Sequence, residues 1–233
     1  MRLTAISLIL TVVLAVFATG CSRKPAEQPP PDETEKITPP AEAGQKTLLD
    51  PETMNETAPE KFLAKFVTSK GDFTIEVTRA WAPNGADRFY NLVNNGYYDD
   101  CRFFRVIENF MVQFGINGDP ALNQVWSQAR LRDDPVMESN QRNYVSFAMT
   151  TLPHSRTTQI FINYKNNSSL DLQRFAPFGR VIEGMNVVDS LYSEYGETPT
   201  AKQPEIQAGG NAYLSKEFPK LDHIKTASIV PTM

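Results

Sequence analysis

The sequence has few of the residues on which most catalytic centres depend. Its 233 residues include only two cysteines and two histidines, and His154 and His223 are not spaced like ligands of one metal ion. It contains no H-E-x-x-H, C-x-x-C, G-x-S-x-G, Walker or G-x-G-x-x-G motif. We therefore expect no metal and no cofactor. An enzyme with this sequence would have to work without a nucleophile or a metal ion.

A strong excess of charge is also lacking. The formal net charge is −4, whereas a protein that binds nucleic acid is expected to carry a basic surface. We therefore expect no nucleic-acid partner. The adjacent carboxylates Asp133 and Asp134 precede Pro135, and a turn explains them better than an acid/base pair.

Long apolar runs are scarce, and the one exception lies at the start of the chain. Leu3–Ala18 follows Arg2 and is shorter than the about 20 residues of a membrane span, as in a secretory signal peptide. The run ATGC at residues 18–21 resembles the bacterial lipobox. That resemblance implies a signal peptide over residues 1–20 and acylation of Cys21. An ordinary signal peptide with an incidental cysteine is the alternative.

The next stretch, residues 21–60, has a composition unlike the rest of the chain. It holds eight of the 17 prolines and carries nine acidic residues against four basic ones. Such a segment buries too little apolar surface to become ordered, which predicts a disordered, proline-rich acidic tether. We expect a lipid-anchored protein of the bacterial cell envelope. Ser22, rather than an aspartate, favours the periplasmic face of an outer membrane, if the organism has one.

Residues 61–233 show the periodicities of one mixed domain with many strands. Apolar residues alternate on both sides of a turn at Lys70–Asp72, which predicts a hairpin. The expected strands are 62–68, 73–77, 103–107, 144–149, 160–163, 178–182 and 223–230. Helices are expected at 83–95 and 185–195, each followed by a glycine. This order predicts a mainly β, closed antiparallel barrel capped by two helices.

The most informative segment is FFRVIENFMVQFG at residues 103–115, which places Arg105 within an apolar strand. An arginine on the polar face of a strand is common, because its aliphatic stem covers apolar surface while the guanidinium stays in water. The segment alone therefore leaves a surface role open.

This segment closely resembles the cyclophilin signature F-H-R-V-I-x-x-F-M-x-Q-G-G-D. Three further stretches resemble the same family in the same order, namely SFAM at 146–149, QIFI at 159–162, and LD at 170–171 followed by FAPFGRV at 175–181. The resemblance covers about residues 62–233. It implies an eight-stranded barrel with a packed interior, a groove on its outer face, and peptidyl-prolyl cis-trans isomerase activity.

The resemblance also implies roles for individual residues. Arg105 would be the catalytic residue, and the substrate-binding residues would be Phe110, Met111, Gln113, Ala148, Met149, Gln159, Phe161, Leu170 and Phe175. The X–Pro barrier of about 18–20 kcal/mol comes from amide conjugation, and no bond is broken in crossing it. A guanidinium that donates a hydrogen bond to the prolyl nitrogen favours the deconjugated, twisted state.

Four positions depart from the family pattern. Phe104, Met149 and Phe175 stand where polar residues are usual and are expected to make the groove more apolar. Ser169 stands where a tryptophan is often found, which puts tight cyclosporin binding in doubt. We expect a monomer that isomerises X–Pro bonds in exported, proline-containing polypeptides and assists their folding. A non-catalytic proline-peptide binding module or chaperone, and a purely structural lipoprotein, remain alternatives.

Overall fold

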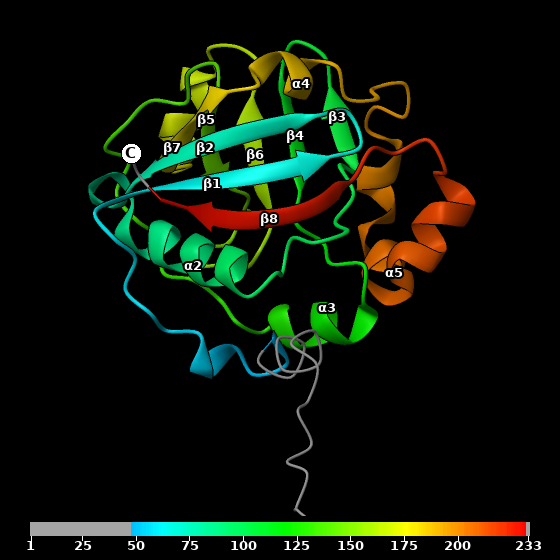
Figure 1. The fold of residues 1–233 in the computed structure, drawn as a ribbon, viewed down its shortest axis with the longest axis horizontal. Coiled ribbons are helices and arrows are strands. Elements are labelled where there is room, and N and C mark those ends of the chain that lie inside the picture. Colours follow the sequence, from blue (N-terminus) through cyan, green and yellow to red (C-terminus); the bar gives the residue numbers. More distant parts are fainter. Residues whose placement is uncertain (1–47, 232–233) are drawn as a thin grey trace, which may run out of the picture. The chain divides into compact units, whose positions relative to one another are not determined.

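The computed structural model describes residues 48–231, so the predicted signal peptide, Cys21 and residues 21–47 of the tether lie outside the described residues. Within this range, eight strands form one antiparallel sheet in the order β3-β4-β6-β5-β7-β2-β1-β8 (Figure 1). The strands are β1 Lys61–Thr68, β2 Asp72–Thr78, β3 Arg105–Ile107, β4 Met111–Phe114, β5 Tyr144–Phe147, β6 Ile160–Asn163, β7 Pro177–Glu183 and β8 Ile224–Val230. The mainly β class and the antiparallel sheet are confirmed.

The two edges of the curled sheet meet through a short backbone bridge. Arg102, just before β3, forms an antiparallel bridge with His223, just before β8. The Phe103 amide donates to the Asp222 carbonyl oxygen at 3.0 Å, and the Ile224 amide donates to the Cys101 carbonyl oxygen at 2.9 Å. These bonds satisfy edge groups that would otherwise be open to pairing with another chain.

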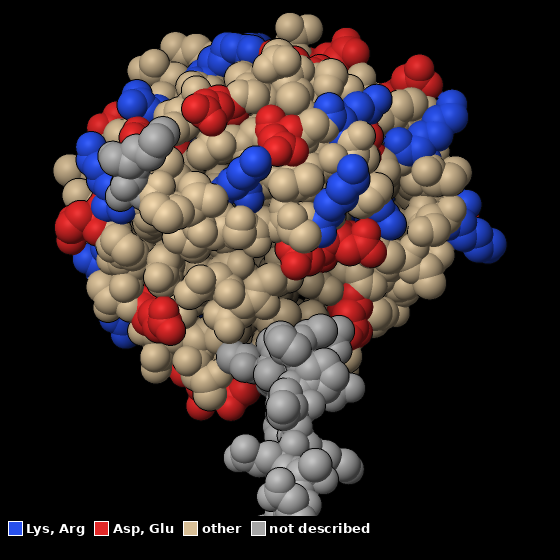
Figure 2. Space-filling model, viewed as in Figure 1, with Lys and Arg blue, Asp and Glu red and all other residues tan. Residues whose placement is uncertain are grey.

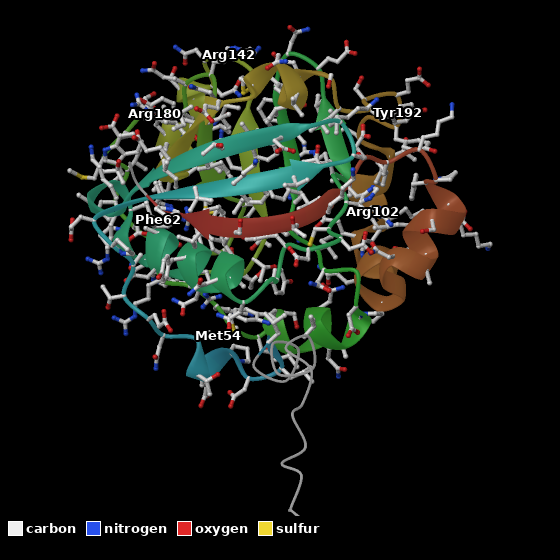
Figure 3. The ribbon with its side chains drawn as sticks, in the orientation of Figure 1. Met54, Phe62, Arg102, Arg142, Arg180 and Tyr192 are labelled. Carbon is white, nitrogen blue, oxygen red and sulfur yellow. The ribbon has the colours of Figure 1, made fainter. Side chains whose placement is uncertain are left out.

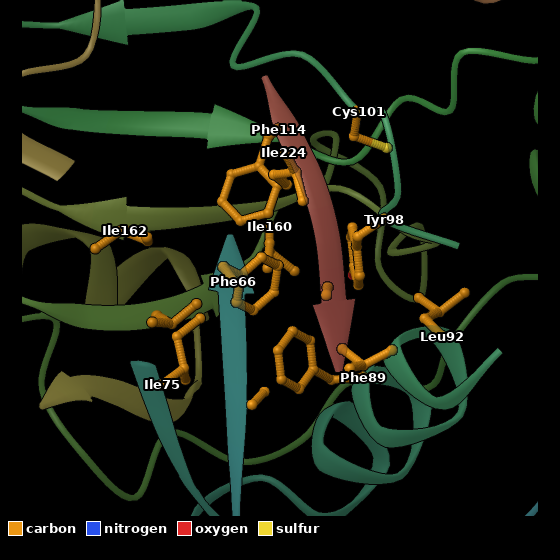
Figure 4. Close-up of a cluster of buried hydrophobic side chains, with 14 of the residues drawn as sticks. Phe66, Ile75, Phe89, Leu92, Tyr98, Cys101, Phe114, Ile160, Ile162 and Ile224 are labelled. Carbon is orange, nitrogen blue, oxygen red and sulfur yellow. The ribbon is translucent and has the colours of Figure 1, made fainter. Parts of the chain in front are cut away.

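The predicted hairpin is confirmed and forms one wall of the core. Phe62, Ala64 and Phe66 of β1 are buried, whereas Lys61 and Lys65 of the same strand are exposed. The Phe66 and Phe73 rings stack with centroids 4.9 Å apart across the β1–β2 pair. Figure 4 shows side chains from the sheet and from the helix beside it meeting in the interior. Alternation with a period of two therefore defined this part of the fold from sequence.

The first predicted helix is confirmed as α2, Pro83–Asn94, which buries Phe89 and Leu92 against the sheet. Its N-terminus is capped from a distant loop, because the Asp134 carboxylate accepts from the amides of Asn84 at 3.0 Å and Gly85 at 2.8 Å. Burial raises the pKa of Asp134, although these hydrogen bonds favour its charged form. Asp134 therefore has a structural role as a helix cap.

The second predicted helix is shorter than expected. The structure has α4 at Met185–Asp189, whereas the apolar spacing predicted a helix to Tyr195. The chain leaves the helix after Ser190, and the Tyr192 amide then donates to the Asp222 carboxylate at 2.8 Å. This tertiary hydrogen bond replaces the intrahelical bond that a longer helix would have used.

Two further helices were not predicted, α3 at Pro120–Trp126 and α5 at Gln203–Glu217, which pack against each other. Asp119 caps α3 by accepting from the Ala121 amide at 2.8 Å. Helix α5 is kinked at Gly210, whose φ is +54°, and a Cβ there would meet the Gly118 carbonyl oxygen. Adjacent glycines lower helix propensity, so α5 was not predictable from local residue preferences.

Helix α5 also explains one residue whose predicted place was wrong. Phe104 was expected in the groove, but it is 1% exposed and packs in a separate apolar cluster with Ile206, Leu214 and Phe218. Ile206 and Leu214 lie on α5, and Phe218 follows its last residue. The phenylalanine at this position therefore anchors the additional helix.

The ordered domain begins earlier than predicted. Residues 48–60, here named the strap, were assigned to the disordered tether, yet Leu48 and Met54 are buried against the domain. The Trp126 indole N–H donates to the Leu48 carbonyl oxygen at 2.8 Å, and the Glu56 amide donates to Asn91 at 3.1 Å. These few apolar side chains suffice to order the strap despite its polar composition. Figure 3 labels Met54 beside the strap's short 3-10 helix, Pro51–Thr53.

Acidic and basic side chains are interspersed on the face shown in Figure 2. In the part of the chain that the structure describes, no helix has both the length and the apolar character needed to cross a bilayer.

Candidate active site

Three adjacent strands bring the predicted site residues into one line across the sheet. Arg105 on β3 pairs with Gln113 on β4, and Gln113 pairs with Phe161 on β6. Side chains of directly opposed residues lie on the same face of a sheet. The signature segment and the QIFI segment, far apart in sequence, therefore contribute to the same surface.

The turn between β3 and β4 places the next pair of residues. Asn109 has a φ of +57°, a conformation that asparagine adopts more readily than most residues. The Phe110 amide donates to the Ile107 carbonyl oxygen at 3.0 Å, which closes the turn. Phe110 thereby lines the same groove as Arg105, whose guanidinium carbon lies 5.9 Å from the Phe110 ring centroid.

Apolar side chains form one half of the groove, here named the apolar pocket. Met111, Phe161 and Leu170 are buried together, and the half-buried Phe110, Ala148 and Phe175 pack against them. The Phe161 and Phe175 rings meet edge to face, with centroids 5.5 Å apart. Together with polar neighbours these residues line a cavity of about 470 Å³. Such a pocket suits a small, rigid, apolar group.

A polar scaffold holds the outer wall of the apolar pocket. Leu170 lies on a 3-10 helix, Ser168–Gln173, together with Asp171. The Asp171 carboxylate accepts from Ser139 at 2.5 Å and from the Asn140 backbone and side-chain nitrogens at 2.9 and 2.7 Å. Desolvation acts to raise the pKa of Asp171, but these hydrogen bonds outweigh it and lower the pKa below the ordinary aspartate value.

The guanidinium of Arg105 occupies the other half of the groove. Its Nη1 donates to Gln113 Oε1 at 3.0 Å. Its Nε and Nη2 donate to the two carboxylate oxygens of Glu197 at 2.9 and 2.6 Å. The Arg105 side chain is 22% exposed, so it remains open to a ligand in the groove.

A chain of amide side chains continues from Arg105. Gln113 Nε2 donates to Gln159 Oε1 at 2.7 Å, and Gln159 Nε2 donates to Gln203 Oε1 at 3.2 Å. Glu197 and Gln203 flank one short 3-10 helix, Thr198–Lys202. Arg105, Gln113, Gln159, Gln203 and Glu197 therefore form a chain of contacts whose two ends are joined by this 3-10 helix, here named the polar ring.

All of the predicted site residues within the described range line this groove. Arg105 and the nine predicted substrate-binding residues are among its lining side chains, Met149 and Phe175 included. Sequence reasoning missed Arg130, Glu197, Gln203 and Gln207. Glu197 lies 92 residues from Arg105 and outside every motif and every predicted helix or strand, so no local signal pointed to it. Asp133 was correctly interpreted as structural, since it pairs with the buried Arg156.

Comparison with known proteins agrees with this arrangement. A sequence model of the cyclophilin type peptidyl-prolyl cis-trans isomerase/CLD family matches residues 63–209. A peptidyl-prolyl cis-trans isomerase of Streptomyces antibioticus is 37% identical over 132 residues, covering 53% of this chain and 79% of that protein. Peptidyl-prolyl cis-trans isomerase B of Escherichia coli is 30% identical over 137 residues, covering 55% of this chain and 83% of that protein.

Solved structures show the same fold. A cyclophilin type peptidyl-prolyl cis-trans isomerase of Cryptosporidium parvum superposes with a TM-score of 0.54 at 19% identity, covering 74% of this chain and 99% of that one. A cyclophilin of Hirschia baltica gives a TM-score of 0.51 at 20% identity, covering 76% of this chain and 77% of that one. With the family match over most of the barrel, the chain belongs to the cyclophilin-type peptidyl-prolyl cis-trans isomerases, enzymes that act on X–Pro bonds.

Proposed function

We propose that this isomerase acts on X–Pro bonds of exported proteins, assists their folding, and uses Arg105 as its catalytic residue. One observation carries the assignment of the residue: the Arg105 guanidinium lies directly beside the apolar pocket while its side chain is partly exposed. A proline ring in the pocket would bring its own nitrogen toward this donor.

The two halves of the groove would do different work. The apolar pocket holds the proline ring, and Arg105 donates to the prolyl nitrogen as its lone pair leaves conjugation with the carbonyl. A rate gain of about 10⁵ requires about 7 kcal/mol of differential stabilisation, more than one hydrogen bond supplies. Immobilising the ring while the carbonyl side rotates must contribute the remainder.

The catalytic role is tested with Arg105→Ala, using NMR exchange of an Ala-Pro peptide with the full-length chain in mild detergent. We expect the exchange rate to fall about 100- to 1,000-fold, the cost of removing one transition-state donor. Peptide binding should persist, because the apolar pocket remains. Equal loss of binding and exchange would contradict the role.

Arg180→Ala is the matched control for this experiment. Arg180 pairs with Glu76 at 3.1 Å between β7 and β2 and does not line the groove. Figure 3 places it on the opposite side of the view from α5. Its exchange rate should stay within about twofold of wild type, as expected for a surface substitution. Wild-type binding without exchange would instead favour the non-catalytic binding module.

We also propose that Cys21 carries the lipid anchor and that the protein resides in the bacterial envelope, on the outer membrane where one exists. The lipobox-like run and the tether composition support this. Metabolic labelling with an alkyne fatty acid should mark the wild-type chain and leave Cys21→Ala unlabelled. Label retained in Cys21→Ala would contradict the anchor, and membrane fractionation would locate the labelled protein.

The role in folding is tested with an exported protein whose refolding has a slow X–Pro phase. Wild-type enzyme should accelerate that phase in proportion to its concentration, and Arg105→Ala should not. A phase that is unchanged by the wild type would contradict the proposed client class.

A further inference from the structure

The short segment from Glu197 to Gln203 contacts the groove at both of its ends. Glu197 binds the Arg105 guanidinium, and Gln203 accepts from Gln159. None of the four motifs that resemble the family includes this segment. It leads into α5, which begins at Gln203 and also contributes Gln207 to the lining of the groove. A part of the chain outside the signature thus completes the surroundings of Arg105.

The direction of every hydrogen bond in the polar ring follows from Arg105. A guanidinium has only donors, so Gln113 must present its oxygen to Arg105 and its NH₂ group to Gln159. Gln159 must then present its own NH₂ group to Gln203. The amide side chains can adopt only one orientation each while the ring is intact.

The ring leaves part of the guanidinium free. Of the five N–H donors of an arginine, Glu197 takes one on Nε and one on Nη2, and Gln113 takes one on Nη1. Among residues 48–231, no partner takes the remaining donor on Nη1 or the remaining donor on Nη2. Because Glu197 binds in the two-point geometry that fixes a planar guanidinium, it also fixes the direction of the remaining donors.

We propose that Glu197 is a positioning residue for the reaction: its two-point contact orients the free Nη1 and Nη2 donors of Arg105 toward the prolyl nitrogen. The inference rests on the proposed role of Arg105. Glu197 itself need not touch the substrate, because it acts through the guanidinium. The negative charge of the Glu197 carboxylate partly offsets the positive charge of the guanidinium. The gain in reaction rate therefore comes from the orientation of the donors rather than from added charge.

Stability should be nearly independent of this pair. The Glu197 side chain is 56% exposed, and exposed ion pairs contribute little to the free energy of unfolding. Hydrogen bonding to Arg105 lowers the pKa of Glu197, so its carboxylate is charged at neutral pH. A neutral substitution should therefore act on catalysis much more than on folding.

The test compares Glu197→Gln with the wild type in the full-length chain, by NMR exchange of an Ala-Pro peptide in mild detergent. We expect kcat to fall about 10- to 100-fold, the cost of a misplaced reacting group. KM should change less than about threefold, because the apolar pocket is intact. An unchanged or higher kcat would overturn the proposal, and so would a loss that appears only in KM.

Glu205→Gln is the matched control, because it removes the same charge from the same part of the chain. Glu205 pairs with Lys202 at 3.2 Å, is exposed, and does not line the groove. Its kcat should stay within about twofold of wild type. An equal fall in both variants would show a general charge effect and overturn the proposal.

An NMR signal of the guanidinium separates positioning from a merely structural role. The Nε–Hε cross-peak of Arg105, assigned by its absence in Arg105→Ala, should be protected from solvent exchange in the wild type and in Glu205→Gln. In Glu197→Gln it should broaden or disappear while the melting temperature stays the same. A protected cross-peak in Glu197→Gln would overturn the proposal.

Combining Glu197→Gln with Arg105→Ala separates the positioning role of Glu197 from the catalytic role of Arg105. If Glu197 acts through Arg105, the double variant should exchange no more slowly than Arg105→Ala alone. Additive losses would overturn the proposal for Glu197. If Arg105→Ala itself retains wild-type exchange, the catalytic assignment fails. If Arg105→Ala is slow and Glu197→Gln is not, only the positioning role fails.

Discussion

The apolar pocket and the polar ring face the same groove, yet they are assembled from different parts of the chain. The pocket comes from strands β4 and β6 and the loops next to them, within the segments that carry the family motifs. The ring needs Glu197 and Gln203, from the segment that leads into α5. In the proposed mechanism, binding of the proline ring thus depends on the barrel itself, whereas the orientation of the guanidinium depends on the segment that follows α4.

Among substitutions that test this contrast, the largest effect should come from one that keeps the positive charge at residue 105 and removes the planar guanidinium. Arg105→Lys retains a cation, but an ammonium lacks the planar fork that Glu197 binds at two points. We expect kcat for an Ala-Pro peptide to fall about 100-fold, as for a catalytic group moved by about 1 Å. Arg180→Lys is the control. Retention of wild-type kcat in Arg105→Lys would show that charge alone is sufficient.

A smaller effect should come from the pocket, and it should appear in binding. Phe161→Leu removes the ring that meets Phe175 edge to face but keeps an apolar side chain. The peptide dissociation constant should rise about tenfold, the usual cost of a poorer fit in an apolar pocket. Calorimetric titration measures it, and NMR exchange at saturating peptide should be much less affected. A larger fall in kcat than in affinity would contradict the assignment of binding to the apolar pocket and of catalysis to the polar ring.

The scaffold of the pocket should respond to pH. The folded-state pKa of Asp171 is lowered, so its contribution to stability is present above the unfolded-state value and is lost as pH falls through the folded-state value. Asp171→Asn should lower the free energy of unfolding by about 1–2 kcal/mol at neutral pH, through weakened hydrogen bonds. Urea unfolding should show that difference shrinking below about pH 4. A difference that is constant down to pH 2 would contradict this account.

The smallest effect should come from restoring a polar residue at the pocket's edge. Met149 lines the groove where the family usually has asparagine. Met149→Asn should change the relative rates for Ala-Pro and Leu-Pro peptides by about threefold, a typical effect for one contact at the margin of an apolar site. Identical ratios in both proteins would show that Met149 does not affect the preference for the residue before proline.

The same contrast explains what could be predicted from the sequence. The hairpin and α2 follow from local periodicity, since Phe62 and Phe66 lie on one face of a strand and Phe89 and Leu92 on one face of a helix. The pocket residues were implied by the resemblance of their segments to the family motifs. Glu197 could not be found in this way, because its partner is 92 residues distant and it lies just outside the helix expected at 185–195. Helix α5 was obscured by Gly209 and Gly210, although Phe104 was a sign that something apolar had to cover it.

The strap has a mechanical consequence for the domain. Tension entering the chain at residue 48 first loads the Leu48 contact with Trp126 and then the contact between Glu56 and Asn91. These contacts bear the force one after another, so the strap detaches one contact at a time. Strand β1 lies between β2 and β8, and its many hydrogen bonds would have to shear together. The strap therefore gives way first, and a pull on the N-terminal side reaches the barrel only after it has detached.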